Sequence, residues 1–553
     1  MTDFEKLAEL LLPNIDKTPD YYENLYPARE LSEGGRVTRI APSPTGYLHL
    51  GTLFTSLVNR ISINGNGVFF TRIEDTDKKR EVEGGIADII DGLNYFGITI
   101  DEGFVTGTEE RGNYGPYKQS LRAEIYQTYV KDLIKRGLAY PCFCTEEELS
   151  ATREEQLEQK IRTGYHGEWA RHRNITFPEA KALIDEGKPF VVRLRSGGSE
   201  DKRIVFDDGI KGKIEMPEND EDFVLLKSDG IPTYHFAHAI DDHLMHTTHV
   251  IRGDEWISSV PKHIELFRVL GFKPPKYAHV SPIMKTEDGA KRKISKRKDP
   301  EAAVRYFIEQ GYDRDSVIEY LMTIASSEFE DWRRANPQES REKFKFNLKK
   351  MSVSGALFDN NKLLDVSKRV VSLMSADEVV EKLLIWANEF DGEFYSLLSA
   401  NTDYAKRLFS IDRGGNKPRK DIAKWNEARD YCSYFYDELY TPCYDMPAHL
   451  DSAVCAAVLR EYIKAYKPTE DKQEWFEQIK SICPAVDFAA DTKEYKQNPD
   501  AYKGNPGDAS TIIRIALTGR QNTPDLCSIM NVLGYDRAIA RLTAAAEHLE
   551  GLN

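Results

Sequence analysis

Apolar and polar positions follow a strand-and-helix pattern in the first part of this chain. Short apolar runs of strand length, such as Val37–Ile40 and Gly67–Asp75, alternate with longer runs that suit a helix. The second of these runs contains β-branched and aromatic side chains and closes on a pair of carboxylates. A β-α-β order of this kind predicts a parallel sheet whose strands are joined by crossover helices.

The pattern changes between about residue 131 and residue 225. This stretch holds a C-F-C triplet (Cys142 and Cys144), a long charged run and short strand-like segments, which together predict an inserted module. Strand–turn–helix order returns in Asp222–His243, and His249–Trp256 supplies another strand end. From about residue 300 the helical period dominates, and beyond about 375 there is almost no strand signal.

Composition indicates the cellular compartment in which the protein is expected. The 553 residues are 41% hydrophobic and 30% charged, with a mean hydropathy of -0.53, and no apolar run approaches the roughly 18 residues that span a bilayer. The N-terminus lacks the basic segment and cleavage site of a signal peptide. Seven scattered cysteines, an odd number, indicate reduced thiols. We therefore expect a cytoplasmic protein that does not bind membranes.

The net charge of -15 limits the ways in which the chain can bind nucleic acid. It argues against a protein that coats nucleic acid through bulk charge. It leaves open a nucleic-acid partner that binds a local basic patch.

The segment R-I-A-P-S-P-T-G-Y-L-H-L-G-T places His49 and Gly51 near a predicted helix start. Free N–H groups there attract anions, and a glycine lets the backbone approach a ligand closely. A histidine can donate to phosphate oxygens without acting as a nucleophile. An isolated H-x-G is nevertheless more often a polar residue at a helix start than a phosphate site.

A basic loop forms the second candidate site. Seven Lys or Arg residues fall between Lys285 and Pro300, and K-I-S-K-R (Lys293–Arg297) lies within them. Two lysines three residues apart can stabilise charge that develops on a pyrophosphate leaving group. An isolated K-x-S-K is nevertheless more often a solvated basic loop or a nucleic-acid-binding segment than a pyrophosphate site.

The two motifs together resemble the two-part signature of class I aminoacyl-tRNA synthetases. Further blocks occur in the order of one family: R-I-E-D-T-D, G-P-Y-K-Q-S, L-L-K-S-D-G-I-P-T-Y-H, D-D-H-L, H-V-I-R-G-D-E-W and K-I-S-K-R-K. From about residue 36 to the C-terminus, and most strongly up to about 300, the chain resembles the bacterial-type glutamyl-tRNA synthetases.

The resemblance implies an α/β fold. The expected core is a Rossmann-like, doubly wound parallel sheet with an inserted α+β module, followed by a stem-contact region and an all-α anticodon-binding domain. The implied divisions are an N-terminal extension (1–35), two halves of the catalytic domain (36–130 and 226–300), an acceptor-binding module (131–225), a stem-contact region (301–374) and the anticodon-binding domain (375–553).

The resemblance also implies an ATP-dependent ligase. ATP, with Mg²⁺, activates L-glutamate as glutamyl-adenylate and releases pyrophosphate, and the terminal adenosine of tRNA(Glu) then accepts the glutamyl group. In this family, tRNA is needed even for activation. Whether tRNA(Gln) is a second partner is left open by the sequence. We expect a monomer.

Residue roles follow at the matching positions. Arg252 is the first candidate for the substrate's side-chain carboxylate, because a guanidinium pairs with it bidentately; Arg39 is the alternative or second partner, and Glu74 is expected to accept from the α-ammonium. The whole predicted glutamate pocket comprises Arg39, Ser43, Glu74, Tyr234, His238 and Arg252.

The ATP-binding residues are predicted from the same motifs. Its residues are Ala41, His49, Gly51, Trp256 and Lys296. The HIGH-type motif comprises Pro42, Ser43, Pro44, Thr45, Gly46, Tyr47, Leu48, His49, Leu50, Gly51 and Thr52, and the KMSKS-type motif comprises Lys293, Ile294, Ser295, Lys296 and Arg297. The catalytic set is His49, Gly51, Lys293, Ser295 and Lys296; none is expected to form a covalent bond with the substrate, because catalysis rests on positioning and charge stabilisation.

Two positions depart from the family. Some members bind zinc in the inserted module, but where their third ligand is expected this chain has Trp169, and a tetrahedral site needs four ligands. We therefore expect Cys142 and Cys144 to form only half a site without zinc, although His166 and His172 lie nearby in the sequence. The second departure is His238, where members often carry asparagine.

Four other classes of protein fit the sequence less well. A glutaminyl relative usually carries a different first motif and a β-barrel anticodon domain, and a truncated tRNA-modifying paralogue lacks the helical half. A nucleotidylyltransferase would not explain the R-I-E-D-T-D block. A non-catalytic tRNA-binding protein would not require His49, Gly51 and Lys296.

Overall fold

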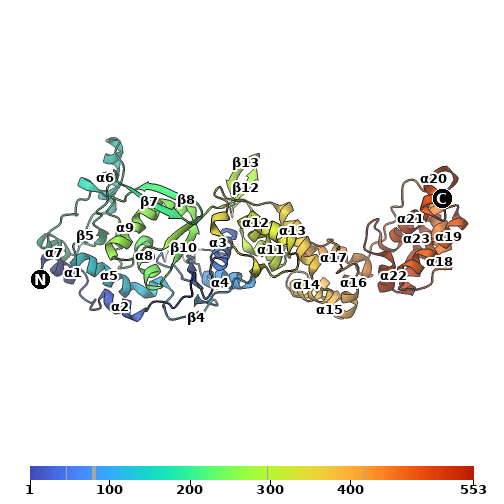
Figure 1. Cartoon of the computed structure of the whole chain (residues 1–553), viewed down its shortest axis with the longest axis horizontal. Coiled ribbons are helices and arrows are strands. Elements are labelled where there is room, and N and C mark those ends of the chain that lie inside the picture. The colour runs from blue at the N-terminus through green and yellow to red at the C-terminus, as the bar shows by residue number, and fades with distance from the viewer. Residues whose placement is uncertain (45, 78–81, 296, 416, 553) are drawn as a thin grey trace. The chain divides into compact units, whose positions relative to one another are not determined.

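The structure is a computed structural model that describes residues 1–44, 46–77, 82–295, 297–415 and 417–552 (Figure 1). The chain divides into two compact units. The first comprises Met1–Tyr306 and Ile318–Asp359, and the second comprises Phe307–Val317 and Asn360–Asn553. Each unit is described separately below. The finer divisions expected from the sequence stay predictions.

Two pairs of parallel strands form the centre of the first unit. They are β1 (Val37–Ile40) with β2 (Val68–Thr71), and β10 (His249–Gly253) with β11 (Lys276–Val280). The two pairs meet beside β1, where the Thr248 N–H donates to the Val37 carbonyl at 3.0 Å. Their side chains are largely buried, as expected for strands covered on both faces. This confirms the predicted α/β core.

Helices follow the strands and pack on them. Helix α3 lies against both β1 and β10, and Asn59 on it donates to the Ile251 carbonyl at 3.1 Å. Helix α9 carries Pro261 in its first turn and is capped by Gly271, whose φ of 79° suits glycine. The helices of this layer are α3 (Leu50–Ile61), α4 (Gly85–Tyr95), α8 (Tyr234–Leu244) and α9 (Val260–Leu270).

The inserted module is an α+β unit around a three-stranded antiparallel sheet. The strand order is β5-β6-β9, and a separate hairpin joins β7 to β8. The strands are β5 (Ala139–Cys142), β6 (Val191–Leu194), β7 (Arg203–Asp208), β8 (Gly212–Pro217) and β9 (Val224–Leu226), and the α-helices are α5 (Ala123–Lys135), α6 (Glu146–Glu158) and α7 (Phe177–Asp185).

The N-terminal extension packs on this module. It forms α1 (Asp3–Leu11) and α2 (Pro19–Leu25), which contact α5. Glu23 accepts hydrogen bonds from Tyr129 at 2.9 Å and lies 2.9 Å from His243. The short antiparallel strands β3 (Gly103–Phe104) and β4 (Glu110–Arg111) pair with each other, and β3 contacts β2.

A hairpin follows the parallel strands and leads into the basic loop. Strands β12 (Ile283–Glu287) and β13 (Ala290–Lys293) are joined by Asp288 and Gly289, which both have positive φ, as a tight hairpin turn requires. The remaining elements of this stretch are β14 (Ala356–Leu357), α10 (Val304–Glu309), α11 (Arg314–Ala325) and α12 (Ser327–Ala335).

The second unit is helical over its described residues, which confirms the predicted all-α domain. Two clusters of buried apolar side chains form its core, one around Leu383 and Phe435 and the other around Leu459 and Ile513. Its helices are α13 (Asn360–Leu373), α14 (Ala376–Phe390), α15 (Gly392–Ala400), α16 (Thr402–Phe409), α17 (Ala428–Tyr431), α18 (Ser452–Ala465), α19 (Lys472–Ile482), α20 (Thr492–Gln497), α21 (Pro506–Thr518), α22 (Leu526–Leu533) and α23 (Tyr535–Glu550). Across the described ranges of the chain, no helix has the length and apolarity needed to cross a membrane.

Candidate active site

A cavity of about 510 Å³ opens where the parallel strands end. Its walls come from the residues that follow β1 and β2 and from the carboxyl ends of β10 and β11. Ligands bind at this edge in open α/β sheets. The predicted residues that line it are Arg39, Ala41, Pro42, Ser43, Gly46, Tyr47, Leu48, His49, Gly51, Thr52, Glu74, Tyr234, Arg252, Trp256, Lys293 and Ile294.

His49 caps helix α3. Its Nδ1 accepts a hydrogen bond from the Gly51 N–H at 2.9 Å. A neutral imidazole that accepts at Nδ1 carries its proton on Nε2. A Cβ at Gly51 would lie 3.1 Å from this Nδ1, so glycine keeps the cap undistorted. The helix start therefore offers both backbone N–H groups and an imidazole donor to an anion.

Arg252 is a buried cation held by neutral groups. Its Nε lies 3.2 Å from His279 Nε2, Nη1 donates to the Tyr234 hydroxyl at 3.2 Å, and Nη2 lies 3.1 Å from His263 Nδ1. The fourth contact, to the Trp256 carbonyl, is longer at 3.4 Å. Among the described residues no carboxylate pairs with this guanidinium. The cavity thus has a wall with a positive charge that none of the described residues neutralises.

Arg39 differs from Arg252 in its charge partner. The Arg39 guanidinium is paired with Asp242, with N–O distances of 3.2 and 3.3 Å, and both side chains are buried. Asp242 also accepts from Arg72 at 2.8 Å. Arg39 therefore borders the cavity as part of a neutralised network, which favours Arg252 as the residue for a substrate carboxylate.

Glu74 follows β2 and borders the cavity with little exposed surface. It lies 3.3 Å from Arg72, yet burial raises the pKa of Glu74 to about 7 against the opposing effect of Arg72 and Arg39. An ammonium group bound beside this carboxyl would favour its ionised form.

The basic loop is organised by Asp299. This carboxylate accepts from the Ser295 N–H at 2.9 Å and from Arg292 at 2.6 and 2.8 Å. Lys285 lies 3.4 Å from it. These contacts, led by the hydrogen bond from Arg292, hold the pKa of Asp299 below its usual value. Two positive side chains and one backbone N–H around this carboxylate fix the loop next to Lys293, which lines the cavity.

Several predicted residues are not at the cavity wall. His238 is fully buried, with its ring stacked on Tyr234 at 6.0 Å between centroids, so it supports the pocket from behind and does not line it. Leu50 and Pro44 are also buried, and Ser295 and Arg297 lie outside the wall. Thr45 and Lys296 fall outside the described residues.

The groups that hold the site residues were not predicted from the sequence. Asp242 neutralises Arg39, His263 and His279 contact Arg252, and Asp299 organises the basic loop. Of these, only Asp242 lies in a block that had been singled out, D-D-H-L. The others have no local pattern that could have revealed them.

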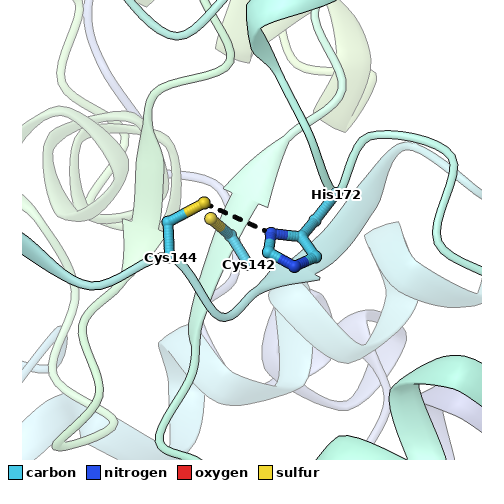
Figure 2. Close-up of side chains that lie close together, drawn as sticks. All are labelled: Cys142, Cys144 and His172. Carbon is cyan, nitrogen blue, oxygen red and sulfur yellow. Dashed lines mark hydrogen bonds between the residues drawn. The ribbon is translucent and has the colours of Figure 1, made fainter. Parts of the chain in front are cut away.

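A second cluster lies in the inserted module, where Cys142, Cys144 and His172 place their ligand atoms within 4.8 Å of one another (Figure 2). His172 Nδ1 is 3.4 Å from Cys144 Sγ. The Tyr165 hydroxyl is 3.3 Å from Cys142 Sγ and 3.6 Å from Cys144 Sγ. Hydrogen bonding from Cys144 lowers the pKa of the Cys142 thiol.

These residues fit a zinc ion. Two sulfurs and one imidazole nitrogen are common zinc ligands, and the Tyr165 oxygen is a fourth donor atom beside them. The expectation of no zinc rested on a set of only two ligands. The structure adds His172 and Tyr165 to the set, while Trp169, at the expected position, is not part of it.

Comparison with known proteins gives consistent results. The family of class I tRNA synthetases for E and Q, catalytic domain, matches residues 36–365, and an anticodon binding domain matches residues 426–546. A protein of Clostridium perfringens (strain 13 / Type A) named glutamate--tRNA ligase is 49% identical over 98% of this chain and 100% of its own length. One from Clostridium beijerinckii with the same name is 50% identical over 96% of this chain and 98% of its own.

A solved structure is similar over most of the chain. It is a glutamate tRNA ligase from Elizabethkingia meningosepticum in complex with its amino acid. The TM-score is 0.72 at 27% identity, and the match covers 93% of this chain and 100% of that one.

Proposed function

The chain belongs to the class I tRNA synthetases for glutamate and glutamine, and we propose that its cavity activates L-glutamate with ATP and transfers it to the 3′ end of tRNA(Glu). The names of its close relatives support this assignment. The observation that carries the choice of glutamate over glutamine is Arg252, a buried guanidinium with only neutral partners among the described residues. A buried charge without a counter-charge favours an anionic ligand.

The proposed reaction has two steps. The α-carboxylate of glutamate attacks the α-phosphorus of ATP, which forms glutamyl-adenylate and releases pyrophosphate. A hydroxyl of the terminal adenosine of tRNA then attacks the acyl carbon, loses its proton and releases AMP. No residue forms a covalent bond, so the protein contributes positioning and charge stabilisation.

The two sides of the cavity divide these tasks. Arg252 binds the side-chain carboxylate, and Glu74 binds the α-ammonium. His49 Nε2 and the N-terminus of α3 donate to phosphate oxygens, and Lys293 stabilises the charge of the leaving pyrophosphate. Lys296, which lies outside the described residues, is given the same role by the motif. The further predicted contacts are Arg39, Ser43 and Tyr234 for glutamate and Ala41, Gly51 and Trp256 for ATP.

Two ions belong to the proposal. Mg²⁺ accompanies ATP and offsets the charge of its phosphates. Zinc is held in the inserted module by Cys142, Cys144, His172 and Tyr165, where it fixes the loop that joins these residues and takes no part in the reaction.

The proposed partners follow from the family. Residues 426–546 match an anticodon-binding domain, which supports tRNA(Glu) as the acceptor. tRNA(Gln) is a second candidate acceptor. The enzyme is proposed to act as a monomer in the cytoplasm.

Pyrophosphate exchange tests the function directly. We expect exchange that requires glutamate and tRNA(Glu) together, and robust exchange with glutamine instead would overturn the assignment. Arg252→Gln is expected to abolish the preference for glutamate over glutamine, whereas retained preference would assign the carboxylate to Arg39. Charging purified tRNA(Glu) and tRNA(Gln) side by side identifies the acceptors.

A further inference from the structure

Histidines are concentrated behind Arg252. Four imidazoles from three elements lie there, none of them at the cavity wall. His235 and His238 come from α8, His263 from α9 and His279 from β11. His238, His263 and His279 have no exposed surface. The proposed function uses none of them as a substrate ligand, so their arrangement needs its own explanation.

The protonation of His279 is fixed by its two neighbours. Arg252 Nε–H can only donate, so His279 Nε2, at 3.2 Å, must accept. The proton of a neutral His279 is then on Nδ1, which lies 2.6 Å from Asp208 Oδ2. Burial lowers the pKa of His279 despite this carboxylate. The ring therefore presents a lone pair to Arg252, and Asp208 contacts its opposite edge.

His263 is fixed by the same reasoning. Arg252 Nη2 donates to His263 Nδ1 at 3.1 Å, which places the His263 proton on Nε2. That Nε2 lies 2.9 Å from His235 Nδ1, which therefore accepts. Burial lowers the pKa of His263 well below its usual value, and burial followed by the charge of Lys262 lowers the pKa of His235 to about 4.

These contacts leave one direction open for the guanidinium. Nε and Nη2 are held by imidazoles, and Nη1 donates one of its two protons to Tyr234 at 3.2 Å. The second Nη1 proton has no partner among the described residues, and Arg252 lines the cavity. The Trp256 and Tyr277 rings lie 5.9 and 5.1 Å from the guanidinium carbon and restrict its tilt.

The type of acceptor beside Arg252 also determines whether the charge of its guanidinium is neutralised. A carboxylate in place of either imidazole would hold Arg252 as firmly but would neutralise it, as Asp242 neutralises Arg39. Neutral imidazoles orient the guanidinium and preserve its full positive charge. In a buried site, such a charge strongly favours an anionic ligand over a neutral isostere.

We propose that His263 and His279 are specificity-determining positioning residues, two neutral acceptors that aim Arg252 at the substrate and reserve its charge for a side-chain carboxylate over a carboxamide. This inference rests on the proposed function of the cavity. It explains why the chain surrounds a buried arginine with imidazoles where a conventional ion pair would bring a carboxylate.

Three substitutions of His263 distinguish the orientation of Arg252 from the neutralisation of its charge. His263→Asn keeps a neutral acceptor, His263→Leu removes it, and His263→Asp adds a counter-charge. We expect His263→Asp to raise the KM for glutamate about 10- to 100-fold, the range of a lost charge-assisted hydrogen bond. The ratio of kcat/KM for glutamate to that for glutamine should fall by a similar factor. The KM for ATP should change less than about twofold.

The other variants complete the test. His263→Leu should raise the KM for glutamate but lower the preference for glutamate over glutamine less than His263→Asp does. In His263→Asn, the KM for glutamate and this preference should both be close to wild type. His279→Leu removes the second acceptor of Arg252 and gives an independent test if a His263 variant unfolds in thermal melts. The control His249→Asn alters a histidine of the same strand as Arg252 whose Nδ1 contacts Thr248, and it should change neither value.

The outcomes are distinguishable. If wild-type protein fails to charge tRNA(Glu) with glutamate, the proposed function is wrong. If wild-type protein charges it but the folded His263 and His279 variants shift the KM values for glutamate and ATP equally, or lose glutamate and glutamine activity in parallel, the positioning role is overturned while the function stands.

Discussion

The Gly51 N–H donates to Nδ1 of His49 at 2.9 Å, and this bond decides what the histidine can do. It places the imidazole proton on Nε2 and makes the same side chain the cap of helix α3. A single residue therefore stabilises the helix and offers a hydrogen-bond donor at its positive end.

The two roles of His49 are separable by mutation. His49→Asn keeps a side-chain oxygen that can cap the helix but lacks a donor at the position of Nε2. We expect turnover in pyrophosphate exchange to fall about 100- to 1,000-fold, the range seen when a donor to a developing charge is removed. The free energy of unfolding should stay within about 0.5 kcal/mol of wild type in urea titrations.

The comparison variant His49→Ala removes both roles. It should lose turnover to a similar extent and about 1 kcal/mol of stability as well. Full turnover in His49→Asn would exclude a donor role for Nε2, and unchanged stability in His49→Ala would show that the cap contributes little.

Asp299 is expected to control the basic loop without touching the substrate. Asp299→Asn keeps the size of the side chain but weakens its bonds to Arg292 and Lys285, so the loop next to Lys293 should become less ordered. We predict a fall in kcat of about 10-fold or more with little change in the KM for glutamate, because positioning near the leaving group acts in the transition state. Steady-state aminoacylation measures both.

A matched change tests whether the effect is local. Glu287→Gln alters an exposed carboxylate that contacts Arg292 at 2.5 Å but not the backbone of the loop. It should leave kcat nearly unchanged. Equal losses in the two variants would point to a general effect of charge and against a specific role for Asp299.

The sequence predicted the elements and the cavity better than the contacts between them. Strand–turn–helix order and the helical second unit are local patterns, and most motif residues line the cavity. The pairs that tune the site are long-range: Arg39 and Asp242 are 203 residues apart, and His263 and His279 approach Arg252 from different elements. Such pairs depend on tertiary packing, which a periodic pattern does not encode.

The cluster in the inserted module shows the same limit. Family spacing pointed to Trp169 as the missing position, whereas the structure brings His172 to the two cysteines. The segment between Cys144 and His172, which holds α6 and irregular chain after it, can change which side chain reaches the site without changing the fold. Ligand sets on loops are therefore predicted less well than the strands that carry the first two ligands.

Metal analysis tests this cluster. We expect about one zinc per chain in the purified protein by elemental analysis, and strong loss of zinc in Cys144→Ser and His172→Ala, because fewer donors remain. His166→Ala is the matched control, since His166 Nε2 contacts the Arg162 carbonyl at 3.1 Å and is not in the cluster. A chain without zinc, or zinc retained in both variants, would remove the proposed metal.

Glu74 predicts how glutamate binding depends on pH. Burial raises its pKa to about 7, so in the free protein the carboxyl gains a proton as pH falls through 7. A protonated Glu74 cannot attract the α-ammonium. The KM for glutamate should therefore rise below pH 7 by up to about tenfold per pH unit and level off above pH 8.

Glu74→Gln provides the control and a second measurement. Its KM should be high and nearly flat between pH 5.5 and about 8.5, since the titrating group is gone. The raised pKa also means that ionised Glu74 destabilises the fold: this cost is fully present above pH 7 and disappears as pH falls toward the unfolded value near 4.5. Glu74→Gln should thus stabilise the protein more at pH 8 than at pH 5 in thermal melts. If the wild-type KM for glutamate is constant from pH 8 to pH 6, Glu74 does not bind the α-ammonium. Its carboxylate would then serve only as a partner of the buried arginines.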